Sequence, residues 1–177
     1  MDYYLRELSR ADLPRINAWR ADRDVVDSLG GAFRYVGLEA DENWFSQYQS
    51  GRANAVRLAI CESASHDIVG AVYLLGIDWL NRSGELSVWI GDRSHQGKGA
   101  GRFACTQLLR HAFIDLNLHR IHLTALAGND RAIKLYQSIG FVEEGRLRQV
   151  AFKNGQYLDM VQMALLASDP GAVKINE

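Results

Sequence analysis

The sequence predicts a single α/β domain, and three observations support this prediction. First, segments that alternate like β-strands and segments with the spacing of amphipathic helices follow one another in the order β-α-α-β-β-β-α-β-α-β-β. Second, the chain has 177 residues, 47% of them hydrophobic, which suits one well-packed domain and is short for two. Third, nothing resembles a linker, a repeat or a low-complexity tract. We therefore expect one domain over residues 1–167 and a loose tail over residues 168–177.

The first part of the chain predicts a strand, a helix, a loop and a second helix. Residues 3–8 alternate as a strand, and residues 12–19 follow as a helix that tolerates Pro14 in its first turn. Residues 20–41 mix two adjacent glycines with aromatic and charged side chains, which favours a loop able to move. The next helix is expected over residues 42–49.

Three strands are predicted in the middle of the chain, over residues 55–61, 68–75 and 85–90. In the third of them, alternate side chains share a face of the sheet. Leu86, Val88 and Ile90 lie on one face, and Glu85, Ser87 and Trp89 lie on the other. One face is expected to join the core, which leaves the other available for chemistry.

The second half of the chain predicts helices over residues 99–116 and 129–139 with a strand over residues 121–126 between them. The apolar stripe of the first helix places Cys105 against the sheet. A hairpin follows, because Asn154-Gly155 separates two strand-like runs over residues 149–152 and 157–165.

Composition argues against several classes of protein. The formal net charge of −1 gives no basic stripe for nucleic acid, and the longest apolar stretch, residues 71–80, is interrupted by Asp78 and too short to span a membrane. The first residues are charged rather than signal-like, so a cytoplasmic protein is expected. Cys61 and Cys105 are too few for a disulfide framework and lack metal-ligand spacing, so no metal site is predicted.

The glycine-rich segment Gly91-Asp92-Arg93-Ser94-His95-Gln96-Gly97-Lys98-Gly99-Ala100-Gly101-Arg102-Phe103 joins a strand to a helix. Such a turn can direct backbone N–H groups and the positive end of a helix dipole at a phosphate. It is not a P-loop, because Lys98 is followed by glycine rather than by serine or threonine. It also fails the dinucleotide fingerprint, which needs glycine or alanine where Arg102 stands.

Two blocks of residues together resemble one known family. Gln96-x-x-Gly99-x-Gly101 resembles the pyrophosphate loop of the GCN5-related N-acetyltransferase (GNAT) family, and Asn129-x-x-Ala132-x-x-x-Tyr136-x-x-x-Gly140-Phe141 matches every anchor of its second motif about 30 residues later. The ending Asn154-Gly155-Gln156-Tyr157-x-Asp159-x-x-x-Met163 is similar to the branch with spermidine and ribosomal-protein N-terminal acetyltransferases. The resemblance implies a central mixed, mostly antiparallel sheet flanked by helices.

The resemblance also implies acetyl-CoA as the donor and assigns residues to it. The backbone of Val88, Trp89 and Ile90 would pair with pantetheine like an added strand. The pyrophosphate would lie on Gln96, Gly97, Lys98, Gly99, Ala100, Gly101 and Arg102. Lys98 and Arg102 are equally well explained as a solvated basic rim, and Asn129 either contacts the cofactor or simply caps a helix.

Two residues are candidates for the chemistry of acetyl transfer. Tyr136, which also borders the cofactor, is the expected general acid for the leaving thiolate, against the alternative of a core tyrosine. Glu85 is the expected base for the amine; it could instead bind a cationic acceptor or pair with an arginine such as Arg82. Neither cysteine has a histidine partner, so we expect direct attack in a ternary complex rather than an acetyl-cysteine.

The acceptor is less defined than the reaction. A small amine, either a polyamine or an aminosugar-like compound, and a protein N-terminus both remain open. Four carboxylates would suit a cationic acceptor but are equally typical of a solvated surface, namely Glu39, Asp41, Glu42 and Asp159. From another class, a catalytically silent CoA-binding sensor or scaffold would have the same fold. Family analogy implies a homodimer, and no nucleic-acid or membrane partner is expected.

Overall fold

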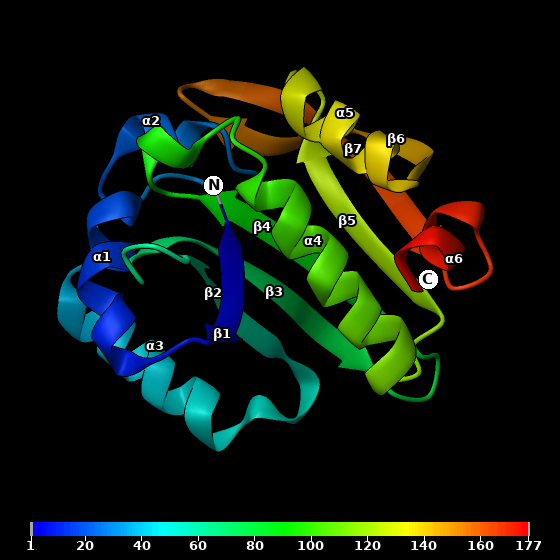
Figure 1. Ribbon diagram of the computed structural model, residues 1–177. Coiled ribbons are helices and arrows are strands. Elements are labelled where there is room, and N and C mark those ends of the chain that lie inside the picture. Colours follow the sequence, from blue (N-terminus) through cyan, green and yellow to red (C-terminus); the bar gives the residue numbers. More distant parts are fainter. Residues whose placement is uncertain (1, 177) are drawn as a thin grey trace.

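The computed structural model describes residues 2–176 and contains one seven-stranded sheet (Figure 1). Its strands stand in the order β1-β2-β3-β4-β5-β7-β6, and of the neighbouring pairs only β4 and β5 run parallel. The strands are β1 (Tyr3–Glu7), β2 (Val56–Glu62), β3 (Ile68–Asp78), β4 (Ser83–Ile90), β5 (Arg120–Leu126), β6 (Val142–Lys153) and β7 (Gln156–Leu166). The predicted mixed, mostly antiparallel sheet is confirmed.

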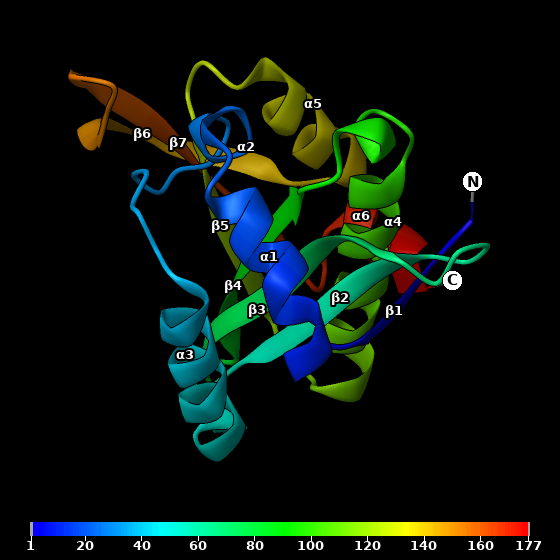
Figure 2. The same cartoon turned by 90° about the vertical axis from the view of Figure 1, so that its left-hand side faces the viewer.

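Helices cover both faces of this sheet, and each face has its own hydrophobic core. The helices are α1 (Leu13–Arg20), α2 (Arg23–Asp27), α3 (Leu38–Ser50), α4 (Ala100–Arg110), α5 (Asp130–Ile139) and α6 (Pro170–Asn176). Side chains of α1, α2 and α3 pack together in one cluster, and those of α4, α5 and α6 pack in the other. Figure 2 shows α1 and α3 on one side of the sheet and α4 on the opposite side. No helix in residues 2–176 is long and apolar enough to cross a bilayer.

The parallel pair β4–β5 holds together at one end only. Ser83 to Glu85 pair with Arg120 to His122, and the two strands then separate (Figure 1). Beyond that point β5 continues beside β7, and residues 86–90 of β4 pair with β3 alone among the described residues. Because a strand exposes backbone N–H and C=O groups on both edges, this stretch of β4 presents an unpaired edge to the gap.

Several predicted boundaries are wrong in ways that follow from packing. The predicted loop over residues 20–41 contains α2, and α3 begins four residues before the expected helix at 42 because Gly37 takes an extended conformation at its N-terminus. The helix expected over residues 99–116 changes to a π-helical turn over His111–Asp115. Strand β6 starts at Val142 rather than 149 and follows β7 through two register shifts.

The tail predicted to be loose is helical and docked. Helix α6 begins at Pro170, and Ala172 on its first turn is completely buried in the core beside α4. The contact depends on two glycines: a Cβ on Gly140 would lie 2.7 Å from the Gly171 Cα, and the reverse substitution gives the same distance. Gly140 also ends α5 with a φ of 118°, as its predicted place after the helix requires.

We expect Gly140→Ala to destabilise the fold by more than the conformational penalty alone. A non-glycine residue in the left-handed region costs about 1–2 kcal/mol, and here the added methyl also meets the backbone of Gly171. Gly155→Ala is a matched control, since its φ is 80° and a Cβ there would meet nothing within 4 Å. Urea unfolding of both variants measures the difference, and equal losses would show that the α6 contact contributes nothing.

Candidate active site

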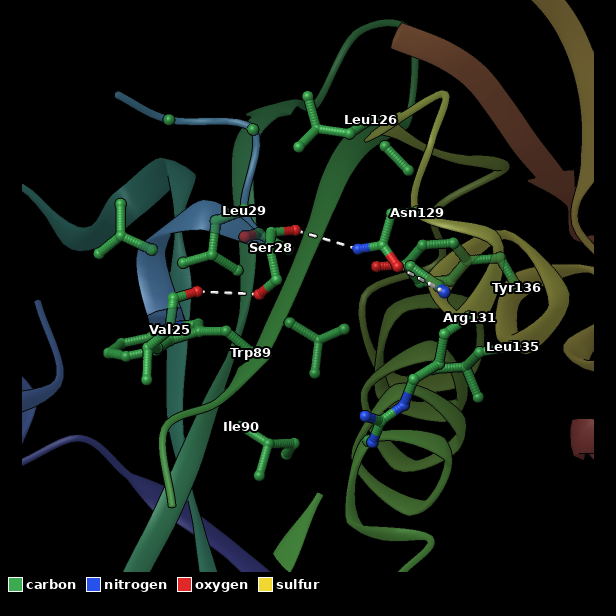
Figure 3. Close-up of a pocket in the computed structure, with 18 of the residues that line it drawn as sticks. Val25, Ser28, Leu29, Trp89, Ile90, Leu126, Asn129, Arg131, Leu135 and Tyr136 are labelled. Carbon is green, nitrogen blue, oxygen red and sulfur yellow. Dashed lines mark hydrogen bonds between the residues drawn. The ribbon is translucent and has the colours of Figure 1, made fainter. Parts of the chain in front are cut away.

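A cavity of about 1010 Å³ lies where β4 and β5 separate (Figure 3). Several parts of the chain line it, among them β4 from Glu85 to Ile90, the glycine-rich loop, the exposed face of α5 and the segment from Val25 to Val36. Arg20, residues 124–126 of β5 and Met160 of β7 complete the wall. The predicted cofactor residues and both predicted catalytic residues come from three of these parts. The segment from Val25 to Val36, which falls within the loop expected over residues 20–41, forms the opposite wall.

The end of β4 packs closely against α1. The ring of Trp89 meets that of Trp19 edge to face at a centroid distance of 5.6 Å. Trp19 also lies so close to Gly91 that a Cβ there would be 2.0 Å from the indole. Val88, Trp89 and Ile90 all line the cavity beside the unpaired backbone edge, which suits an extended ligand carrying amide groups.

The glycine-rich loop has the backbone that anion binding needs. Gly97 and Gly99 take positive φ values of 76° and 91°, and Gly99 precedes the first turn of α4, of which Gly101 and Arg102 line the cavity. The Gln96 side chain donates from Nε2 to the Ile90 carbonyl at 3.0 Å. The predicted glutamine therefore ties the loop to the end of β4.

The predicted cations of this loop do not act alike. Lys98 is exposed and does not line the cavity, and Ala100 is buried in the core behind it. Arg102 does line the cavity, but its guanidinium donates to the Ser138 hydroxyl at 2.6 Å and to the Ser138 carbonyl at 3.3 Å. Arg102 thus joins α4 to the end of α5 and carries positive charge to the cavity rim.

Two cations of α5 that line the cavity were missed by the sequence reading. Arg131 and Lys134 project from the first turns of α5, and a Cβ on Gly97 would be 3.6 Å from the Arg131 guanidinium. Figure 3 shows Arg131 beside Leu135 on this face. The sequence could have indicated them, because helical spacing places Arg131, Lys134 and Leu135 on one face of the helix. These positions are not anchors of the family motif.

Asn129 caps α5 and also crosses the cavity. Its Oδ1 accepts from the Ala132 N–H at 3.1 Å, as an N-cap does, while its Nδ2 donates to the Ser28 carbonyl at 3.0 Å (Figure 3). The predicted cap is confirmed. Its amide also connects α5 to the opposite wall, so a direct contact with the cofactor stays a prediction.

Tyr136 is a buried tyrosine that borders the cavity. It is 7% exposed, packs edge to face on Phe141 at 5.9 Å and lies near Cys105. Burial, and to a smaller extent Cys105, raises the pKa of the phenol above its ordinary value near 10, so the hydroxyl keeps its proton at neutral pH. Tyr136 therefore packs in the core, as the alternative expected, and also lines the cavity, while its role as general acid stays a prediction.

The two cysteines are buried thiols with depressed reactivity. Burial raises the pKa of Cys105 to about 12, and burial is also the largest cause of the raised pKa of Cys61. Neither cysteine lines the cavity. Because the thiolate is the nucleophile, the structure gives no support to an acetyl-cysteine route.

Glu85 stands where β4 leaves β5, and it lines the cavity half-buried. It is the one carboxylate in the described cavity wall, which also contains arginines and a lysine. No ion pair to Glu85 is found in residues 2–176, and the guanidinium of Arg82 instead faces Asn117 at 3.4 Å. The surface-pair alternative with Arg82 is therefore not what the structure contains.

The four carboxylates considered for a cationic acceptor do not reach the cavity. Asp41 is 1% exposed and bound by Arg20 and by Asn17, whose Nδ2 lies 2.7 Å away. Asp159 pairs with Arg146 at 2.9 Å. Glu39 and Glu42 lie on α3, away from the cavity wall. Two of these charges thus stabilise the fold.

Comparison with known proteins agrees with this geometry. The acetyltransferase (GNAT) domain family matches residues 3–142. Spermidine N(1)-acetyltransferase of Vibrio cholerae is 35% identical over 164 residues, covering 93% of this chain and 92% of that protein. The putative ribosomal N-acetyltransferase YdaF of Bacillus subtilis is 32% identical over 124 residues, covering 70% of this chain and 65% of that protein.

Solved structures give the same result. A crystal structure of spermidine N-acetyltransferase from Vibrio cholerae in complex with CoA and spermine matches with a TM-score of 0.86 at 31% sequence identity. The match covers 94% of this chain and 96% of that one. With the unpaired edge of β4, the glycine loop and the motif helix in place, the chain belongs to the GNAT family of acetyl-CoA-dependent N-acetyltransferases.

Proposed function

We propose that this protein transfers the acetyl group of acetyl-CoA to the primary amine of a small acceptor, by direct attack in a ternary complex. The observation that carries the proposal is the joining of four features in one cavity: the unpaired edge of β4, the glycine loop, Tyr136 and Glu85. A donor held along β4 and an acceptor entering beside Glu85 would meet without any covalent enzyme intermediate. The buried, protonated cysteines are consistent with this route.

The wall of the cavity fits the parts of acetyl-CoA. Backbone groups of Val88 to Ile90 offer hydrogen bonds to the amides of pantetheine, and the N–H groups between Gly97 and Gly101 offer them to the pyrophosphate. Arg131 and Lys134 add positive charge on the phosphate side, beside the loop. When bound, the donor supplies a thioester, whose carbonyl carbon is the electrophile.

Tyr136 and Glu85 supply the proton transfers in this proposal. Glu85 accepts a proton from the incoming ammonium, directly or through water, because only a neutral amine has a free electron pair. Tyr136 donates its phenolic proton toward the sulfur as the thiolate leaves. Burial makes Tyr136 a weaker acid than a free phenol, but a dry cavity also raises the proton affinity of the thiolate.

Two acceptor classes are favoured by different observations. The relatives named as spermidine acetyltransferases favour a polyamine. The cavity itself favours an amine with a single positive charge, such as an aminosugar-like compound or a peptide N-terminus, because the positive charge of Arg34 lies in the same wall as Glu85. Arg20 is neutralised by buried Asp41, whereas Arg34 has no ion pair among the described residues.

The test is thiol release from acetyl-CoA with a panel of amines: spermidine, spermine, an aminoglycoside, a nucleotide-linked aminosugar, and peptides beginning with Ala, Ser or Thr. Arg34→Glu is assayed beside the wild type. A polyamine acceptor should react faster with Arg34→Glu, and an amine that carries an anionic group should react more slowly. CoA binding with no turnover on any amine would favour the silent sensor instead.

A further inference from the structure

A buried lysine that does not itself line the cavity holds one wall of the cavity in place. Lys153, the last residue of β6, is 6% exposed, and its ammonium donates to three backbone carbonyls. These carbonyls belong to Val26 at 2.8 Å, Leu29 at 2.6 Å and Gly31 at 2.7 Å. An ammonium has three protons, so every one of them is used on a single short segment.

The segment that Lys153 holds is the wall opposite α5. Val26, Leu29 and Gly31 all line the cavity, and so do Ser28 and Gly30. Lys153 itself is not part of that wall. Figure 2 shows the β6–β7 hairpin extending outward beside α2, which brings its tip to this segment.

The conformation of the segment depends on the ammonium for an electrostatic reason. Three carbonyl oxygens converge within 2.8 Å of one point, and without a cation between them their negative ends would repel one another. The other side-chain ties from outside the segment are single bonds: Asn129 to the Ser28 carbonyl, and Asn154 Nδ2 to the Asp27 carboxylate at 3.0 Å. Neither replaces the three-way contact.

We propose that Lys153 is a positioning residue for the acceptor, which acts by fixing residues 26–31 as the wall against which the amine is held. The inference rests on the proposed function, since it concerns the acceptor side of the same cavity. Among the described residues, the hydrogen bonds of the Lys153 ammonium go to residues 26–31 and not to the glycine loop or the unpaired edge of β4, so donor binding should be independent of it. An amine held less firmly would reach the reacting geometry less often.

Two variants test this. Lys153→Met keeps the length of the side chain but removes its charge, and Lys153→Arg keeps the charge on a side chain of different shape. Arg120→Met is the matched control. Arg120 binds Glu144 at 2.6 Å and ties β5 to β6 outside the cavity, so its loss weakens the same sheet without touching residues 26–31. For each variant, kcat and KM for the acceptor, the Kd of CoA and the Tm are measured.

We expect Lys153→Met to raise the acceptor KM about tenfold or more, with the Kd of CoA changed less than about twofold, and Lys153→Arg to recover part of the loss. Arg120→Met should lower the Tm and leave the acceptor KM unchanged. Equal behaviour of Lys153→Met and Arg120→Met, or parallel losses for CoA and acceptor, would overturn the proposal.

Hydrogen exchange separates this proposal from the proposed function. In the full-length protein, Lys153→Met should speed amide exchange in residues 26–31, and Arg120→Met should not. This readout needs no substrate, so it holds if no amine in the panel reacts. If Lys153→Met does not fold, the comparison is made with Lys153→Gln, which keeps a hydrogen-bond donor but removes the charge, and unchanged exchange and KM in that variant would contradict the role.

Discussion

Tyr136→Phe is expected to keep CoA binding and to lose about 100- to 10,000-fold of kcat, the range typical of a general acid or base. The phenylalanine ring would keep the packing on Phe141 and the buried position on α5. What is lost is the hydroxyl proton at the border of the cavity. Isothermal titration gives the Kd of CoA, and acetyl-CoA turnover with the reacting amine gives kcat.

Tyr48→Phe is the matched control for this experiment. Tyr48 is 8% exposed in the core beside α1 and α3 and does not line the cavity, so its hydroxyl is lost from a similarly buried site. It should leave kcat and CoA binding unchanged. If Tyr136→Phe loses CoA binding and turnover to the same extent, Tyr136 is a packing residue of the cofactor site rather than an acid.

The pH profile provides a second check on Tyr136. Its pKa is raised by burial above the ordinary phenol value of about 10, so the acid form dominates up to about pH 9. A limb of the kcat profile between pH 5 and 9 must therefore come from another group. Tyr136→Phe should lower the whole profile and leave its shape unchanged, whereas a lost limb would assign that limb to Tyr136.

The sequence predicted those parts of the site that depend on local backbone chemistry. Gly97 and Gly99 take the positive φ values that an anion-binding turn requires, and Asn129 caps α5 with the side chain expected of it. Gly140 ends the same helix in a left-handed conformation. In each case a residue type and its immediate neighbours decide the structure, so the pattern is visible without the rest of the chain.

Features that join distant segments were not predictable in this way. The separation of β4 from β5 depends on which strands pair, and the docking of α6 depends on Gly171 meeting Gly140 across the fold. Lys153 is separated by more than 120 positions from the carbonyls it binds. A lysine near a hairpin turn reads as a solvated surface residue until its partners are known.

Charge counting from the sequence was similarly incomplete because it could not assign partners. Asp41 looks like a free carboxylate beside Glu42, but it is buried and bound by Arg20 and Asn17. Arg102 looks like a phosphate ligand, yet its guanidinium also caps the end of α5 through Ser138. The cavity consequently has a different charge balance from the one that the composition of its loops indicates.

Glu85→Gln is expected to lower kcat/KM at pH 7 by about 100-fold or more, with recovery as the pH rises. Glutamine preserves size and can still accept a hydrogen bond, but it cannot take a proton from an ammonium. An alkyl ammonium has a reference pKa near 10, so the amine becomes neutral unaided in alkaline solution and the base is no longer needed. The variant should approach the wild type above about pH 9.5.

The same pH series distinguishes a base from a binding group at Glu85. If Glu85 only attracts a cationic acceptor, Glu85→Gln raises KM for the amine by a similar factor at every pH at which the amine stays charged, and kcat changes little. Glu85→Asp is the control for position, since it keeps a carboxylate and withdraws it by one methylene. Because Glu85 is the one carboxylate in the described cavity wall, no second carboxylate there can take over either role. A pH-independent loss confined to KM would therefore show that Glu85 binds the amine and does not deprotonate it. The proton would then leave through solvent.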